Sequence, residues 1–141
     1  MKELILKSGK YLFIFILSVL VNSSCDKIDS QIPDMPVGLQ IDLNLLNELT
    51  VPGNSMYFPG QGFGGVIVYC EVEGSYFAYD AACTHEISTS CKVQPDGLTG
   101  TCSCCGSTYI LIGGYPTSGV ATAPLRQYNV SAYGNTVRVY N

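Results

Sequence analysis

Alternating apolar and polar residues along the second half of the chain predict a series of short β-strands. Residues 39–46 carry apolar side chains at the odd positions, which is typical of a strand with one buried face. Residues 65–72 form a nearly continuous run of β-branched and apolar residues, which indicates a fully buried strand. A turn at residues 73–75 then returns the chain into a paired strand at residues 76–80.

Turn signals separate the remaining expected strands. Pro52-Gly53-Asn54 and Pro95-Asp96-Gly97 are strong turn sequences, and Gly113-Gly114 is another. We expect strands near residues 57–58 and at residues 108–112, 125–130 and 136–140. No stretch after residue 39 repeats its apolar residues with the helical period of 3.6, so the predicted fold class is all-β and antiparallel.

The N-terminal residues have the pattern of an export signal. Lysines at positions 2, 7 and 10 precede an apolar run at residues 11–21, which is shorter than the ~20 residues that cross a bilayer. Small residues then lead to Cys25, so residues 1–24 resemble a bacterial lipoprotein signal peptide with lipidation at Cys25. The alternative is a secretory cleavage nearby that leaves Cys25 as a free thiol.

The rest of the chain divides into a linker and one domain. Residues 25–38 contain two prolines and no apolar period, which predicts a flexible tether, and residues 39–141 are long enough for one domain. We therefore expect an exported, membrane-anchored lipoprotein that faces the periplasm or the cell surface. Only seven of the 141 residues are Lys or Arg and they form no basic stripe, so we expect no nucleic-acid partner.

Two cysteine-rich stretches carry the candidate chemistry. The first is Cys83-Thr84-His85, and the second is Cys102-Ser103-Cys104-Cys105-Gly106-Ser107. Thiolates and imidazoles are the side chains that hold iron–sulfur clusters and zinc. His85 is the one histidine of the chain, so a metal site here has at most one imidazole ligand.

This order of motifs resembles the Rieske [2Fe–2S] domain family. The resemblance implies a Rieske-like antiparallel β sandwich or barrel with a small two-loop cluster-binding subdomain. It also implies that Cys83 and Cys102 hold one iron and that His85 and the residue at position 105 hold the other. Cys105 stands where the family has its second histidine, so the expected ligand set is three thiolates and one imidazole.

The resemblance extends to residues around the ligands. It implies that Ser107 and Tyr109 donate hydrogen bonds to the cluster sulfurs, which would raise the reduction potential; packing roles for both are the alternative. It also implies a disulfide between Cys91 and Cys104 that clips the two loops together. Cys70 lies in a predicted buried strand and is expected to be an ordinary core residue.

Exchanging an imidazole for a thiolate makes the oxidised cluster more negative. We therefore expect a midpoint potential between the Rieske range of roughly −150 to +300 mV and the plant-type value of about −400 mV. Two alternatives remain open: zinc, because three thiolates and one imidazole are an ordinary structural zinc set, and a metal-free domain stapled by disulfides.

The expected function is one-electron transfer to an unidentified redox partner protein. The sequence has no Ser/His/Asp set and no phosphate-binding glycine loop before a helix, so an electron-transfer component is favoured over a stand-alone enzyme. A non-redox lipoprotein that uses the fold for binding or structure is the alternative from another class.

Overall fold

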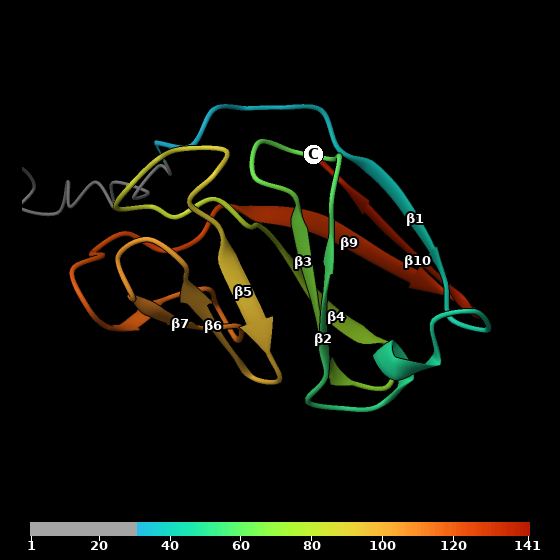
Figure 1. Cartoon of the computed structure of the whole chain (residues 1–141). Helices are drawn as coiled ribbons and strands as arrows, with labels where there is room; N and C mark the ends of the chain where they lie inside the picture. Colours follow the sequence, from blue (N-terminus) through green and yellow to red (C-terminus); the bar gives the residue numbers. More distant parts are fainter. Residues whose placement is uncertain (1–30) are drawn as a thin grey trace, which may run out of the picture.

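The computed structural model describes residues 31–141. The predicted signal peptide, Cys25 and the first part of the tether therefore lie outside the described residues. Two antiparallel sheets make up the fold (Figure 1). The larger sheet has the strand order β1 (Gly38–Asp42), β10 (Thr136–Tyr140), β9 (Gln127–Tyr133), β4 (Ser75–Asp80), β3 (Val66–Val72) and β2 (Ser55–Phe58). The smaller sheet has the order β5 (Val93–Asp96), β6 (Thr99–Cys102), β7 (Thr108–Ile110) and β8 (Pro116–Ser118).

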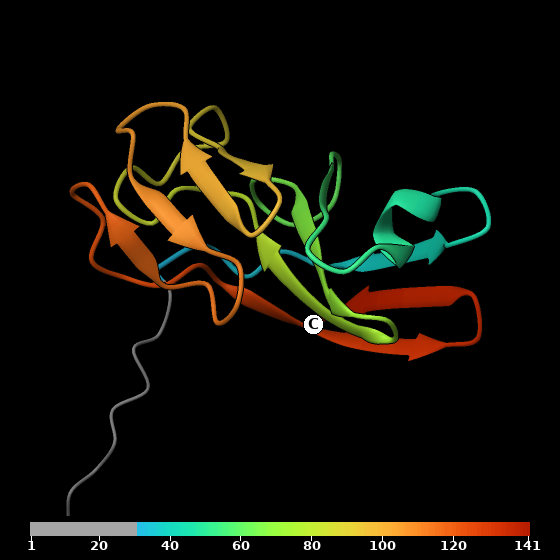
Figure 2. The same cartoon turned by 90° about the horizontal axis from the view of Figure 1, so that it is seen from below.

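The larger sheet curls into a half-barrel, and the smaller sheet packs beside one end of it (Figure 2). The expected all-β, Rieske-like fold is therefore confirmed. One short 3-10 helix, η1 (Asn47–Thr50), is the helical element among residues 31–141. Nothing helical in this described range has the length and apolar character needed to cross a membrane.

Strand β3 joins two hydrophobic cores, which explains its continuous apolar sequence. Val66 and Val68 point into a core inside the curled sheet, together with residues of β1 and β10. Ile67 and Tyr69 point the other way, into a core shared with the smaller sheet. Because successive side chains of a strand alternate between its faces, both faces of β3 must be apolar.

The first predicted strand ends earlier than its alternation suggested. Strand β1 stops at Asp42, whose carbonyl accepts hydrogen bonds from the backbone N–H of Leu45 (3.1 Å) and Leu46 (3.0 Å). The Asp42 carboxylate also accepts the Asn44 N–H at 2.9 Å. Asp side chains readily stabilise turns in this way, so the chain leaves the sheet although its apolar pattern continues.

The smaller sheet contains three strands that the sequence pattern did not predict, namely β5, β6 and β8. Strand β5 includes Pro95 and Asp96, so the turn begins at Gly97 and not at Pro95, where the Pro-Asp-Gly sequence predicted it. Strand β8 has three residues and begins at Pro116. Prolines are tolerated at the first residue of a strand and on sheet edges, and β5 and β8 are the two edge strands.

Candidate metal centre

Two loops at one end of the smaller sheet carry the cysteines. The first loop follows β4 and contains Cys83, and the second links β6 to β7 and contains Cys105. A disulfide between Cys91 and Cys104 joins the loops. A backbone hydrogen bond from Ser103 N to Lys92 O (2.9 Å) adds to this connection, and one from Cys83 N to Cys91 O (3.0 Å) closes the first loop on itself.

The three predicted thiol ligands lie together. The Sγ atoms of Cys83, Cys102 and Cys105 all lie within 4.8 Å of one another, and those of Cys83 and Cys105 are 3.5 Å apart. Cys83 and Cys102 are buried, whereas Cys105 is half-buried at the edge of the site. None of the three is in a disulfide, so all are available as metal ligands.

His85 lies on the same loop as Cys83 but outside this group of donors. Its side chain is exposed to solvent, two residues beyond Cys83. The structure thus brings together three of the four predicted ligands. An exposed side chain is free to change its rotamer, and the short spacing from Cys83 keeps the imidazole on the loop that carries the site.

Ser107 is buried beneath Cys105. Its Oγ lies 3.2 Å from Cys105 Sγ and accepts the N–H groups of Val120 and Ala121, each at 3.0 Å. The Cys105 thiol donates to this oxygen, whereas a Cys105 thiolate can only accept, so the Ser107 hydroxyl would then be the donor. This contact is the main reason that the pKa of Cys105 is lowered to about 7.

Tyr109 contacts the other side of the site. Its hydroxyl is 3.7 Å from Cys83 Sγ and 2.9 Å from the Thr84 Oγ1. Thr84 Oγ1 donates to the carbonyl of Ala123 at 2.8 Å, so it can only accept from Tyr109. The Tyr109 hydrogen is therefore shared between Thr84 and Cys83, and burial raises the pKa of Tyr109 to about 12.

The thiol of Cys102 is buried. Burial raises the pKa of Cys102 to about 11. Cys102 and Cys105 therefore shift in opposite directions, because one thiol is desolvated and the other accepts a hydroxyl hydrogen bond. A cation bound among the three sulfurs would favour the thiolate form of all of them.

Asp80 positions the first loop and was not singled out from the sequence. Its buried carboxylate accepts N–H groups from Phe63 (2.7 Å), Gly64 (2.9 Å) and Ala82 (2.8 Å), and the hydroxyl of Tyr128 (2.6 Å). The loop between β2 and β3 is thus tied to the residue just before Cys83. Neither Asp80 nor Thr84 has a local sequence signal, because their partners are distant in the chain.

The remaining cysteine and the surface hollows lie away from the metal centre. Cys70 is fully buried in β3, as expected of a core residue, and burial raises its pKa. Two shallow hollows of about 380 and 390 Å³ open on the larger sheet, lined by residues such as Thr50 and Glu73 in one and Gln40 and Arg138 in the other. Neither hollow includes a cysteine of the site.

Comparison with solved structures gives fold-level matches. No protein-family model matches the chain, and no curated protein is significantly similar to it. The chain is similar to the ferredoxin of carbazole 1,9a-dioxygenase from Nocardioides aromaticivorans IC177, with 23% identity and a TM-score of 0.50 over 75% of this chain and 97% of that one.

Two further matches are weaker in structural score. A chain from a complex of reduced oxygenase and oxidized ferredoxin in carbazole 1,9a-dioxygenase has 26% identity and a TM-score of 0.49, covering 63% of this chain and 90% of its own. A Sphingomonas yanoikuyae B1 ferredoxin has 22% identity and a TM-score of 0.47, covering 64% and 88%. The Nocardioides match shows that three quarters of this chain shares the fold of a ferredoxin, in agreement with the Rieske-like architecture described above.

Proposed function

We propose that this chain is an electron-transfer protein in which Cys83, Cys102, Cys105 and His85 hold a [2Fe–2S] cluster. The observation that carries the proposal is the group of three sulfurs within 4.8 Å of one another on two clipped loops. The Rieske-like fold supports it, because such loops at the end of a small sheet are where the resemblance expects a cluster. Bound there, the cluster would accept and release one electron.

The donor set fits such a cluster chemically. Thiolates are the usual ligands of [2Fe–2S] centres, and imidazoles replace two of them in Rieske centres. Three cysteines already face one another, and His85 supplies the fourth donor once its exposed ring turns toward them. With one imidazole and three thiolates, this ligand set lies between the all-thiolate cluster and the Rieske cluster with two imidazoles.

The surrounding residues orient the ligands and adjust their charge. The Ser107 hydroxyl lies against the sulfur of Cys105, and the Tyr109 hydroxyl lies against Cys83 and Thr84, so both can donate to a sulfur once it is a thiolate. Such donors stabilise negative charge on sulfur and favour the reduced state. Replacement of one imidazole by a thiolate acts in the opposite direction, so we infer a midpoint potential below the Rieske range and above about −400 mV.

Zinc is a second candidate, and the sulfur distances favour it specifically. A tetrahedral Zn²⁺ with Zn–S bonds of about 2.3 Å places its sulfurs about 3.8 Å apart. Cys83 and Cys105 Sγ are 3.5 Å apart, close to that value, although the resemblance assigns them to different irons. A zinc-bound domain would have a structural or binding role.

Metal content decides between these candidates. We expect the full-length protein, purified without oxygen from its own compartment, to be red-brown and to contain about two irons and two acid-labile sulfides per chain. Cys102→Ser should remove both, whereas Cys70→Ala, a change outside the site, should retain them. Colourless protein with one zinc and no sulfide would overturn the iron–sulfur proposal and support the zinc site.

We also propose that the chain is exported and anchored to a membrane through a lipid on Cys25, and that it passes electrons to a partner protein. The charged leader, short apolar run and small residues before Cys25 support this. Mass spectrometry of the mature protein should find a diacylglyceryl modification at Cys25, absent from Cys25→Ser. An unmodified mature N-terminus elsewhere would contradict the anchor without affecting the metal site.

A further inference from the structure

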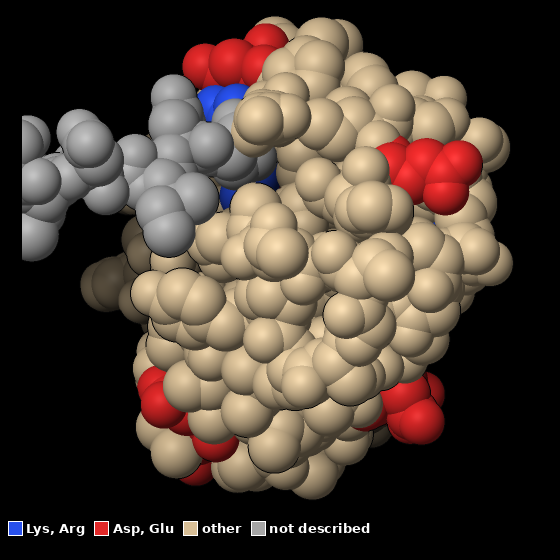
Figure 3. Space-filling view, turned by 90° about the vertical axis from the view of Figure 1, so that its left-hand side faces the viewer, with Lys and Arg blue, Asp and Glu red and all other residues tan. Residues whose placement is uncertain are grey.

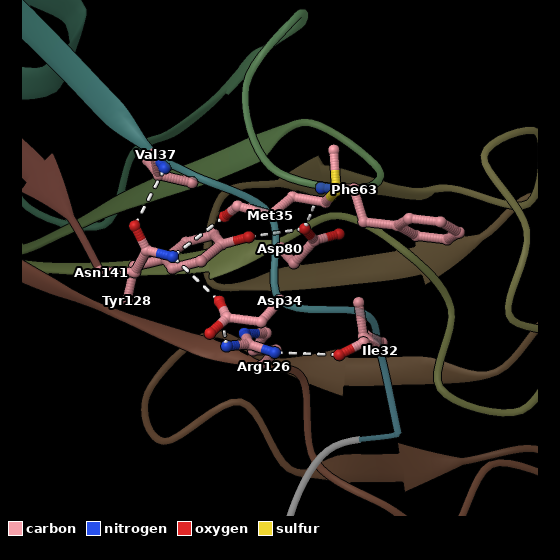
Figure 4. Close-up of polar contacts among 9 residues, drawn as sticks. All are labelled: Ile32, Asp34, Met35, Val37, Phe63, Asp80, Arg126, Tyr128 and Asn141. Atoms are coloured by element: carbon pink, nitrogen blue, oxygen red, sulfur yellow. Dashed lines mark hydrogen bonds and ion pairs between the residues drawn. The ribbon is translucent and has the colours of Figure 1, made fainter.

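Residues 31–37, the strap, lie along the surface of the domain, although the sequence assigns them to a flexible tether. Ile32 and Val37 are buried. Arg126 donates to the Ile32 carbonyl at 2.9 Å and pairs with Asp34 at 2.6 Å (Figure 4). Asn141 donates to Asp34 (2.9 Å) and accepts the Val37 N–H (3.0 Å). The strap therefore has a defined place on the domain.

The strap begins at the end of the domain that carries the cysteines. Arg126, which holds Ile32 and Asp34, accepts the Asp80 backbone N–H at its carbonyl (2.8 Å), and Asp80 lies three residues before Cys83. Figures 1 and 2 both show the blue segment that begins the described chain starting next to the loops of the smaller sheet, while the turn between β9 and β10 lies at the opposite end.

The chain between the predicted lipid anchor and the strap is short. Cys25 precedes Ile32 by seven residues, which span at most ~25 Å when fully extended. This reach is shorter than that of a tether that is free along all of residues 25–38. A lipid on Cys25 would therefore keep the cysteine-loop end, and not the opposite end, close to the bilayer.

The surface at this end suits a lipid headgroup layer. Figure 3 shows a broad uncharged area on this face, with Asp and Glu side chains at the rim and Lys or Arg side chains at the upper left. Exposed apolar side chains occur on its loops, with Ile87 after β4 and Val120 after β8. From residue 31 onward the chain has eight Asp or Glu against three Lys or Arg, and exposed Glu86 lies beside Ile87, so an uncharged lipid surface suits the domain better than an anionic one.

We propose that the strap and the short linker hold the cysteine-loop end of the domain against the lipid surface in which Cys25 is anchored. The inference rests on the lipidation proposed above, and it adds an orientation that lipidation alone does not give. An electron partner would then reach the metal centre along the plane of the membrane.

Tryptophan fluorescence tests this orientation, because the chain has no tryptophan of its own. Ile87→Trp places a reporter on the loop after β4, and Tyr133→Trp places one at the opposite end, where the native side chain is 91% exposed. Full-length lipidated variants are reconstituted in phosphatidylcholine vesicles with or without brominated acyl chains. We expect brominated lipid to quench the Ile87→Trp reporter at least twofold more than the Tyr133→Trp reporter.

A second pair of variants tests the strap itself. Fifteen Gly/Ser residues inserted after Ser30, outside the strap, should reduce the Ile87→Trp quenching to the level of the Tyr133→Trp variant. Asp34→Ala with Asn141→Ala, which removes the Asp34–Arg126 ion pair and the Asn141 hydrogen bonds of the strap, should also reduce it. Circular dichroism confirms that each variant is folded.

The outcomes separate this inference from the proposals on which it rests. Equal quenching at the two positions in lipidated protein overturns the proposed orientation and leaves the lipid anchor intact. This result is expected if the loop end faces away from the membrane and contacts a soluble protein. Absence of the lipid from Cys25 by mass spectrometry overturns both. Metal content is measured independently of either result.

Discussion

The Oγ of Ser107 lies 3.2 Å from the Sγ of Cys105, the cysteine that stands where the family resemblance expects a histidine. The oxygen of this hydroxyl also accepts the backbone N–H groups of Val120 and Ala121. The Cys105 thiol donates to this oxygen and a Cys105 thiolate would accept from it, whereas the Tyr109 hydroxyl has Thr84 as a nearer partner than Cys83. Ser107 is thus the better-placed donor of the two.

Ser107→Ala should lower the midpoint potential of the metal centre, because the reduced state loses a hydrogen bond to a negative sulfur. We expect a decrease on the order of 60 mV, equivalent to about 1.4 kcal/mol for one electron. Tyr109→Phe should give a smaller decrease. Protein-film voltammetry measures both, with Ser118→Ala on the exposed strand β8 as the control. An unchanged potential in Ser107→Ala would refute the donor role.

The disulfide between Cys91 and Cys104 joins the two loops across a sequence separation of 13 residues. Closing a loop of this size stabilises a folded protein by about 3 kcal/mol. The double variant Cys91→Ala/Cys104→Ala should therefore unfold at lower denaturant concentration and lose metal faster to a chelator. Urea titration and the decay of visible absorbance measure these effects. Equal rates of metal loss in wild type and variant would show that the loops need no clip.

Gly64 allows the loop between β2 and β3 to approach the first cysteine loop. A Cβ at this position would lie 2.4 Å from the backbone nitrogen of Ala82, closer than atoms can pack. Gly64→Ala should therefore displace the loop and destabilise the domain by several kcal/mol, about the cost of overpacking a core. Gly38→Ala, where a Cβ meets nothing within 4 Å, is the matched control. Similar thermal midpoints for the two variants would contradict this account.

Two buried phenols make stability depend on alkaline pH. Burial is the main cause of the raised pKa of both Tyr79 and Tyr128, and the carboxylate of Asp80 raises that of Tyr128 further. The unfolded chain releases these protons first, near pH 10, so their stabilisation is complete below pH 10 and is lost as the pH rises above it.

We expect the free energy of unfolding to fall above pH 10, and to fall less steeply in Tyr128→Phe. Urea titrations from pH 8 to pH 12 measure the slope, with Tyr133→Phe at an exposed position as the control. A slope in Tyr128→Phe identical to that of the wild type would show that this phenol ionises alike in the folded and unfolded chains.

The sequence predicted the parts of the structure that depend on local patterns. Strands β3, β4 and β10 follow from apolar runs and turns, and the grouping of Cys83, Cys102 and Cys105 agrees with what the family resemblance implied. The strap could not be predicted, because Ile32 shows no periodicity and its partner Arg126 lies 94 residues away. Asp80 was missed for the same reason, since the groups it binds are gathered by the fold and not by sequence proximity.

The central claim depends on whether His85 is the fourth ligand of the metal centre. The motif predicts it as a ligand, and the structure places its exposed ring on the loop of Cys83 but outside the group of three sulfurs. Because it is the one histidine in the chain, labelling with nitrogen-15 histidine marks this residue alone. Its role can therefore be measured without mutation.

Pulsed electron paramagnetic resonance of the dithionite-reduced, full-length protein tests the central claim most directly. We predict a signal from a reduced binuclear iron centre with coupling to a single imidazole nitrogen, and we predict that this coupling changes when histidine is labelled with nitrogen-15. No paramagnetic signal on reduction, in a protein that contains zinc, would contradict the account, and a binuclear iron signal without nitrogen coupling would remove His85 from the ligand set.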